Sequence, residues 1–407
     1  MRRPDFDTAA FRRVFGVAGA VPTFEAAVPL STLIAVLVLP LRRTAGWPPW
    51  VKALAFSAAA GTVTFVLSAA VNGTGVAVGS TGQFAMCVLF LVALRVTLTS
   101  VGRAAQYLSW LSLSMIGYYL IVRPENTRAG IAELWKYGIA YPVTVVALYV
   151  LVARGASRRL AGACLVILGS AGLALDFRSY GLVCMGAAVA TWAVGRGGRV
   201  PRRVIGIALG AVVLSFALPS AISAGWFGDE VRARTIAQGQ FNGPMLLAGR
   251  TEPPLSIAAI SSRPVLGWGN AQTLDADTVS AGVRLAQAFG MGSSERYVPL
   301  WVRSEGRISL HSILFGSWVE GGVVAVIFPV LLIVLFGVGL VRARGRFAIL
   351  VALTSLQGIW DVLFSPWGGN KSVVLSAYAM LAALAIASSD EKDERPRISG
   401  RSASVRR

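Results

Sequence analysis

Stretches of about twenty consecutive apolar residues recur along almost the whole of this chain. A stretch of that length spans the hydrocarbon core of a bilayer as an α-helix, and about eleven candidates are present. They cover residues 24–40, 51–71, 82–98, 105–122, 134–153, 160–176, 181–195, 204–223, 313–340, 347–365 and 373–388. The sequence therefore predicts an all-α fold, a polytopic transmembrane helical bundle of about 11 (10–12) spans.

The composition supports the membrane class. The chain has 407 residues, of which 55% are hydrophobic and only 14% are charged. A soluble domain of this length cannot bury so much apolar surface, because its exterior still has to be covered by polar groups. The arginine-containing N-terminal segment, residues 1–23, leads into further spans, so we expect no cleavable signal peptide.

The net charge of +19 is concentrated in every second short loop. The basic residues of these loops are Arg42, Arg43, Lys52, Arg95, Arg103, Arg154, Arg158, Arg159, Arg196, Arg199, Arg202, Arg203, Arg342, Arg344 and Arg346. This is the positive-inside pattern, which assigns these loops to the cytoplasm and argues against a nucleic-acid-binding surface. The outer loops then lie near 72–81, 123–133, 177–180, 224–310 and 366–372.

The N-terminus conflicts with this alternation. With a single span at 24–40, the four arginines before residue 14 would lie outside. The apolar stretch 14–40 is too short for two crossings, which need roughly 40 residues. An interfacial or re-entrant N-terminal helix would restore a cytoplasmic start, and the sequence leaves both orientations open.

The spans divide the chain into regions. The first eight spans occupy 24–223, a large extracytoplasmic loop occupies 224–310, and the last three spans occupy 311–388. The loop contains apolar helical stretches, "PPLSIAAISS" and "SAGVRLAQAF", so we expect an ordered, partly helical cap over the outer face. Residues 389–407 are highly charged and predict a disordered cytoplasmic tail.

The chain offers a poor ligand set for a metal. It has one histidine and three cysteines, and the cysteines all lie inside predicted spans, where they are expected to pack as small apolar residues. The sequence contains no Cys-x-x-Cys pair and, outside the charged residues 389–407, no cluster of carboxylates. We therefore predict no metal site and no cofactor.

Two ionisable residues stand at the start of the ninth predicted span. His311, the single histidine, is placed at the outer membrane boundary, where its near-neutral pKa suits a proton acceptor; capping the helix is the alternative role. Glu320 lies about 13.5 Å further along a continuous helix, so the two are not partners unless the backbone breaks at Gly316, Gly321 or Gly322. A glutamate there needs a polar or cationic partner, and an arginine from another helix is the natural candidate, in either a structural or a catalytic role.

Further cations lie on the outer side. Arg178 belongs to the tight turn "LALDFRSYGLV" and has the right shape to bind a phosphate, although snorkelling to lipid headgroups is an alternative. Arg250 precedes the irregular segment 263–272, whose backbone amides could face an anion. Asp361 and Lys371, at the last outer corner, are lower-ranked candidates that would also suit an ordinary interface.

Three motifs resemble the O-antigen ligase and polymerase superfamily. They are "HSILFGSWVEGGVVA", "GRTEPPLSIAAISSRPVLGWGN" and "DFRSYG". Their order, spacing and membrane placement are similar over about residues 170–340. Three positions depart from the family pattern, namely Phe177, Ser179 and Ala325. The arginine, histidine and glutamate positions are retained.

The resemblance implies a function. Such enzymes move a glycan from a polyprenyl-pyrophosphate carrier to an acceptor hydroxyl outside the cytoplasmic (inner) membrane. His311 would then be the base or the orienting group, Arg178 and Arg250 would bind the pyrophosphate, and Glu320 would support the arrangement, with inversion and without a metal. The alternatives are a transporter or flippase of a lipid-linked glycan and a non-catalytic scaffold subunit. The sequence does not separate a ligase from a polymerase.

Overall fold

The computed structural model describes most of the chain. The described residues are 8–20, 22–23, 28–38, 47–121, 130–195, 204–206, 209–210, 213, 220–226, 228–229, 232–233, 251–291, 294–296, 298–302, 308, 310–368 and 370–394.

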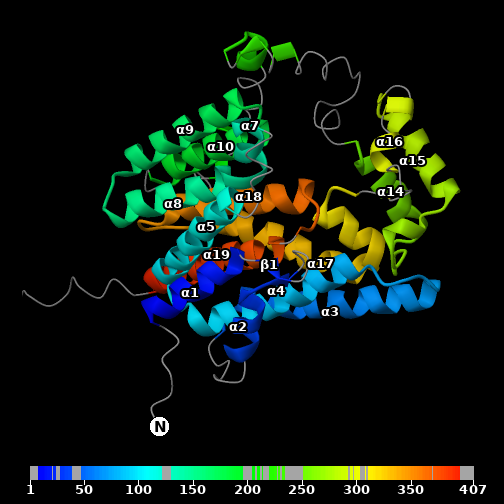
Figure 1. Ribbon diagram of the computed structural model, residues 1–407, viewed down its shortest axis with the longest axis horizontal. Helices are drawn as coiled ribbons and strands as arrows, with labels where there is room; N and C mark the ends of the chain where they lie inside the picture. Colours follow the sequence, from blue (N-terminus) through cyan, green and yellow to red (C-terminus); the bar gives the residue numbers. More distant parts are fainter. Residues whose placement is uncertain are drawn as a thin grey trace, which may run out of the picture.

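The fold is all-α (Figure 1). The long helices are α3 (Pro49–Asn72), α4 (Val78–Thr97), α5 (Val101–Ile121), α8 (Ala140–Ala153), α9 (Arg158–Ala174), α10 (Arg178–Gly195), α17 (Ile313–Arg342), α18 (Ala348–Phe364) and α19 (Lys371–Glu394). A short helix, α7 (Ile131–Leu134), and a π-helical turn, η2 (Trp135–Ile139), lead directly into α8. The prediction of a helical fold is confirmed.

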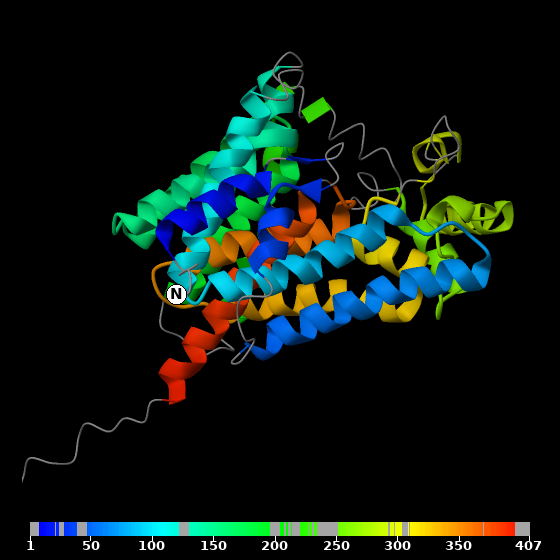
Figure 2. The ribbon, with the colours of Figure 1, turned by 60° about the horizontal axis from the view of Figure 1, so that its bottom comes forward.

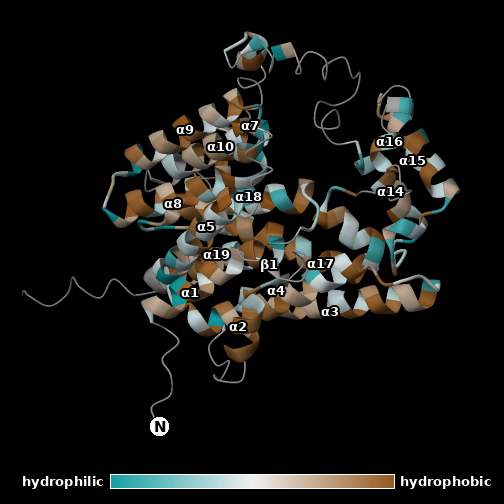
Figure 3. Cartoon of the chain, viewed as in Figure 1, coloured by the Kyte–Doolittle hydropathy of each residue, from teal (hydrophilic) through white to brown (hydrophobic). Residues whose placement is uncertain are grey.

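Five described helices are long and apolar enough to cross a membrane. They are Pro49–Asn72, Val78–Thr97, Ile131–Ala153, Ile313–Arg342 and Lys371–Ser389, and the shorter Ala348–Phe364 is also apolar. Figure 3 shows hydrophobic residues along most of the bundle and more hydrophilic residues on the part formed by α14 and α15. The chain is therefore a membrane protein, and the higher number of about eleven spans stays a prediction.

The N-terminal region differs from the predicted span at 24–40. Helix α1 (Ala9–Ala20) is followed by the two-residue strands β1 (Pro22–Thr23) and β2 (Val28–Pro29), which pair antiparallel. Helix α2 (Ser31–Val38) has eight residues, about 12 Å, which is too short to span a bilayer. Because α1 packs on α5 and its Phe15 is fully buried, the region is a short folded-back element on the bundle.

The core of the bundle is built around α18 and α19. Most residues of α19 up to Ile386 are buried, and α19 contacts α4, α5, α17 and α18 (Figure 2). Small residues permit close approach: Gly339 of α17 packs against Ala382 of α19, and Gly358 of α18 packs against Phe336 of α17. Small residues at helix contacts are the usual means of packing helices in a membrane.

Helix α17 is broken at Gly322. This residue has φ 70° and ψ −164°, a backbone region that only glycine adopts readily. The break is filled by the segment before α17: Trp268 N donates to Val319 O at 2.7 Å, Gly269 N donates to Glu320 O at 2.9 Å, and Val323 N donates to Val265 O at 3.0 Å. The prediction that glycines could interrupt this helix is confirmed for Gly322.

The two halves of α17 fold back on each other. Phe336 packs against Gly358, and Ser365, seven residues further along α18, is then about level with Pro329. Ile313 N donates to Ser365 O at 2.9 Å, so the first half of α17 begins at that level beside the end of α18 (Figure 1). The second half, from Val323 to Arg342, is about 30 Å long and can span a membrane by itself.

The end of α18 is recessed relative to the C-terminal end of α3 and the N-terminal end of α4. The Sγ atom of Cys87 lies 3.9 Å from the carbonyl oxygen of Ser372 at the start of α19. Cys87 is nine residues into α4, so α19 begins about 13.5 Å short of the N-terminal end of α4. Figure 1 shows α3 reaching past the end of α18 toward α14 and α15. The end of α18 is therefore set back from the ends of these two helices.

The described part of the large loop is helical. It contains α14 (Pro253–Ser262), η3 (Ala271–Thr273), α15 (Ala276–Ala288), η4 (Ser294–Arg296) and α16 (Val298–Trp301). Helices α14 and α15 pack together around Leu255 and Ala286, and α14 also packs on α17. This compact helical unit agrees with an ordered cap, and its placement outside the membrane stays a prediction.

The C-terminal boundary is corrected. The predicted disordered tail was 389–407, but α19 continues to Glu394. Residues 389–394 therefore extend the last helix, and Ser389 Oγ donates to Arg342 O at 3.2 Å, which ties this end to α17. The rest of the predicted tail lies outside the described residues.

Candidate functional site

His311 is paired with a carboxylate. Its Nδ1 atom lies 2.7 Å from Oε1 of Glu252, and the side chains are 24% and 12% exposed. His311 comes from the segment that precedes α17, and Glu252 comes from the start of α14, so residues 59 positions apart in sequence form the pair. A histidine held by a mostly buried carboxylate has a fixed orientation.

Four hydrogen bonds to backbone groups hold the segment on either side of His311. The next residue, Ser312, caps α17 by accepting a hydrogen bond from Phe315 N, and Ile313 N donates to Ser365 O. On the other side, Gln272 clamps Ile308, with its Nε2 donating to the Ile308 carbonyl at 2.9 Å and its Oε1 accepting from the Ile308 amide at 2.8 Å. The imidazole is therefore carried by a segment held at both ends.

Glu252 is equally well anchored. Pro253 and Pro254 occupy the first turn of α14. The backbone N–H groups of a first turn have no partner within the helix, so proline loses no hydrogen bond there. The indole Nε1 of the fully buried Trp301 donates to the carbonyl of Thr251 at 2.8 Å. Ser256 donates to the Glu252 carbonyl from both its amide and its hydroxyl. The backbone on either side of this carboxylate is thus held in place.

Glu320 lies at the other end of the first half of α17. Its carboxylate accepts a hydrogen bond from the hydroxyl of Ser80, near the start of α4, and one from Ala271 N at 3.3 Å. The expected arginine partner is replaced, among the described residues, by a hydroxyl and a backbone amide. Because the break follows Glu320, the helix rises about 10.5 Å from Ile313 to Glu320 and separates Glu320 from His311. Glu320 therefore braces the break in α17 and does not contact the Glu252–His311 pair.

The predicted anion-binding amides of the segment 263–272 are engaged elsewhere. The amides of Trp268 and Gly269 donate to carbonyls of α17, and the amide of Gly267 donates to the Arg263 carbonyl. A Cβ atom on Gly267 or Gly269 would collide with the backbone of α17 or α3, so both glycines serve a close approach. The interpretation of this segment as an anion cradle is wrong for these three amides.

Arg178 begins α10 and pairs with Asp176 in the turn before it. Arg178 Nε lies 3.2 Å from Asp176 Oδ1, and Asp176 has a left-handed φ of 55°, as expected in a tight turn. Gly186 of α10 packs against Leu356 of α18. Gly186 lies eight residues after the start of α10, and Leu356 lies eight residues before the end of α18. The structure thus places Arg178 and the residues around His311 at the same end of α18.

Arg250 lies outside the described residues. In the chain it stands two positions before Glu252, the carboxylate that pairs with His311.

Asp361 and Lys371 form an ion pair with each other. Lys371 Nζ lies 2.6 Å from Asp361 Oδ1, and the Asp361 side chain is 4% exposed. Ser365 Oγ also donates to Asp361 Oδ1 at 3.0 Å, which links this pair to the turn that holds Ile313. The geometry favours a structural role, because the pair joins the end of α18 to the start of α19.

Removing Lys371 is expected to destabilise the protein more than removing both charges. In Lys371→Met the mostly buried Asp361 carboxylate loses its counter-ion, and we expect a loss of about 2 kcal/mol after allowing for the partly exposed lysine. The double variant Asp361→Asn/Lys371→Met should recover most of that loss. Thermal unfolding of the three proteins in detergent measures the difference, and equal destabilisation by the single and double variants would contradict the pairing.

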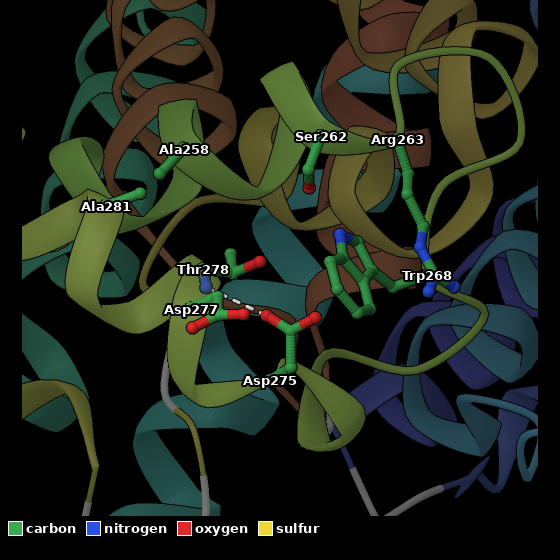
Figure 4. A pocket seen from close by; sticks show the side chains of 8 residues that line it. All are labelled: Ala258, Ser262, Arg263, Trp268, Asp275, Asp277, Thr278 and Ala281. Carbon is green, nitrogen blue, oxygen red and sulfur yellow. Dashed lines mark hydrogen bonds between the residues drawn. The ribbon is translucent and has the colours of Figure 1, made fainter.

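The cap carries a separate open cavity of about 300 Å³ (Figure 4). Arg263 stacks on Trp268 at 4.0 Å from the ring centroid, and Asp275 and Asp277 lie across the cavity. A side-chain hydrogen bond with Thr278, together with the Thr278 amide, lowers the pKa of Asp275, which caps α15. The cavity contains polar groups suited to hydroxyls, but the described contacts are those of a helix start.

The described residues contain no group of three or more His, Cys, Asp or Glu side chains that could hold a metal ion. Cys87 and Cys184 are buried within the bundle.

Sequence reasoning missed Glu252. A single glutamate in a long loop gives no periodic signal that separates it from the stretch around Arg250. The sequence feature that could have identified Glu252 is its position directly before two prolines. Prolines favour the first turn of a helix, so the residue before them is held at a helix start. No family model matches the chain, and no curated protein sequence matches it either.

Proposed function

We propose that this chain is a membrane glycosyltransferase of the O-antigen ligase or polymerase type. The observation that carries the proposal is the Glu252–His311 pair, held at the recessed end of α18 where Arg178 also lies. A proton acceptor and a guanidinium at one end of an apolar bundle suit a reaction between a hydroxyl and a lipid-linked pyrophosphate.

The proposed reaction requires only the donor, the acceptor and the side chains of this site. The acceptor hydroxyl attacks the anomeric carbon of the carrier-linked glycan and loses its proton to His311. The bond between the anomeric carbon and the pyrophosphate oxygen breaks, so the configuration inverts and the polyprenyl pyrophosphate departs with the electron pair. Arg178 and Arg250 are assigned to the pyrophosphate, whose negative charge grows as it leaves. In this proposal arginine supplies that stabilisation without a metal.

The proposal places the site on the extracytoplasmic side of the cytoplasmic membrane, as the alternation of basic loops predicts. The donor reaches the site from the bilayer and the acceptor from the aqueous side. Glu320 receives a supporting role, since it holds the broken helix that carries His311. An acceptor that is itself carrier-linked makes the enzyme a polymerase, and a different envelope molecule makes it a ligase.

A transporter or flippase of a lipid-linked glycan is the second candidate, and one observation favours it. Broken helices carrying an ionisable group are frequent at transporter binding sites, and α17 is broken next to Glu320. However, three backbone groups at this break are hydrogen-bonded to the segment 265–269, and the Glu320 carboxylate is bound by Ser80 and Ala271. The break is thus already filled by protein, which favours the transferase.

The arginine variants test the proposal. Arg178→Ala and Arg250→Ala are each expected to lower the release of polyprenyl pyrophosphate from a polyprenyl-pyrophosphate oligosaccharide by about 10- to 100-fold, since each removes a charge-assisted contact of about 1.5–3 kcal/mol. The measurement uses purified protein in proteoliposomes.

Arg284→Ala is the matched control, because Arg284 is an exposed arginine on α15 away from the pair. It should release the carrier at the wild-type rate. If all three variants match the wild type, the assignment of pyrophosphate binding to these arginines is wrong.

A further inference from the structure

The Glu252–His311 contact involves one particular ring nitrogen. Oε1 of Glu252 lies 2.7 Å from Nδ1 of His311. A carboxylate accepts hydrogen bonds, so Nδ1 carries the proton in this contact. The second ring nitrogen, Nε2, lies on the opposite side of the imidazole and is then the position where a proton can be gained.

The two side chains of the pair differ in their exposure to solvent. Glu252 is the more buried partner, at 12% against 24% for His311. The imidazole is therefore the more accessible member of the pair.

We propose that Glu252 is the positioning residue of the site, which holds His311 as the Nδ1–H tautomer and directs Nε2 to the acceptor hydroxyl. The inference rests on the proposed glycan transfer for its catalytic meaning. During transfer, Nε2 takes the acceptor proton and the ring becomes a cation beside the Glu252 carboxylate, which stabilises that charge. The carboxylate itself keeps its charge throughout.

The anchoring of both partners supports this role. Trp301 and Ser256 hold the backbone around Glu252, while Gln272 and Ser365 hold the segment around His311. These contacts come from separate elements of the cap and from the end of α18. A proton acceptor must be held within a fraction of an ångström of its working position, and a doubly anchored pair achieves that.

The single histidine makes the tautomer directly measurable. Protein labelled with ¹⁵N-histidine and reconstituted in nanodiscs gives ring signals from His311 alone when any affinity tag lacks histidine. At a pH where the ring is neutral, the wild type is expected to show a protonated Nδ1 and a bare Nε2. In Glu252→Gln the amide can donate to Nδ1, so the Nε2–H form should gain population.

Kinetics provide the second readout. Glu252→Gln is expected to lower kcat for glycan transfer by about 10²–10⁴-fold while KM for the donor stays within about twofold, because the donor's pyrophosphate is bound elsewhere. Glu252→Asp keeps the carboxylate and should restore part of kcat. The matched control is Glu295→Gln, an exposed glutamate of the cap, which should keep wild-type kcat. Circular dichroism and melting temperature confirm that each variant is folded.

The outcomes are distinct. A bare Nδ1 in the wild type, or unchanged kcat in a folded Glu252→Gln protein, would overturn the positioning role. A wild type with the Nδ1–H tautomer and no glycan transfer would overturn the proposed function and the catalytic role of the pair, yet confirm that Glu252 sets the tautomer. Loss of kcat together with the altered tautomer in Glu252→Gln is the expected result.

Discussion

His311→Ala is expected to lower the rate of glycan transfer by about 10²–10⁴-fold, the usual contribution of a positioned proton acceptor. The side chain is the only histidine, and the fold holds it against the Glu252 carboxylate near the end of α18. Removing it leaves the acceptor hydroxyl without a group to take its proton. Donor consumption by purified protein in proteoliposomes measures the loss.

The fold should tolerate this change. His311 is partly exposed and precedes the helix, whose cap is provided by Ser312. The melting temperature should therefore fall by only a few degrees, the shift that about 1 kcal/mol produces. A folded His311→Ala protein that transfers glycan at the wild-type rate would remove His311 from the mechanism.

Gly322→Ala is expected to destabilise the protein by about 2–6 kcal/mol, combining backbone strain of about 1–3 kcal/mol with a steric clash of similar size. At φ 70° and ψ −164° an alanine is strained, and its Cβ atom would collide with the carbonyl of Val265. The collision also pushes the segment 265–269 away from the break. Unfolding in detergent, followed by tryptophan fluorescence, measures the loss.

Gly316→Ala is the matched control for this change. Gly316 lies in the first half of the same helix, and a Cβ atom added there meets no atom of another described segment within 4 Å. Since alanine is the better helix former, the variant should be as stable as the wild type or more stable by up to about 1 kcal/mol. If both glycine variants unfold at the same temperature, the break at Gly322 does not matter for stability.

Much of the helical architecture could be predicted from local pattern. The helices α3, α4, α17 and α19 coincide with apolar runs, because crossing a bilayer requires about twenty such residues whatever their neighbours are. The span expected at 24–40 fails for the opposite reason. Its apolar residues are divided between a strand pair and a short helix, which hydropathy alone cannot distinguish from one span.

The geometry of the candidate site was less predictable. Sequence spacing separated His311 from Glu320 along one helix, but it did not show that the chain turns back at Gly322 and brings Ile313 beside Ser365. The partner of His311 comes from a helix 59 residues away, and such long-range contacts leave no trace in local periodicity. The partner of Glu320 was expected to be an arginine, yet Ser80 and a backbone amide satisfy it.

The two ends of the broken half-helix have different tasks in this account. Glu320, Ser80 and the segment 265–271 lock the break, while His311 and Glu252 form the reactive end. A short helix fixed at its far end holds the imidazole more rigidly than a loop would. In the proposed mechanism the broken helix positions His311 without touching the reacting atoms.

The most direct test of glycan transfer is a leaflet-resolved mass balance in proteoliposomes that contain only this protein, a polyprenyl-pyrophosphate oligosaccharide and an acceptor. The account predicts one polyprenyl pyrophosphate released for each glycan transferred, with both products on the extracytoplasmic side. Donor that moves between leaflets intact, with no release of carrier pyrophosphate, would contradict the account and identify a transporter.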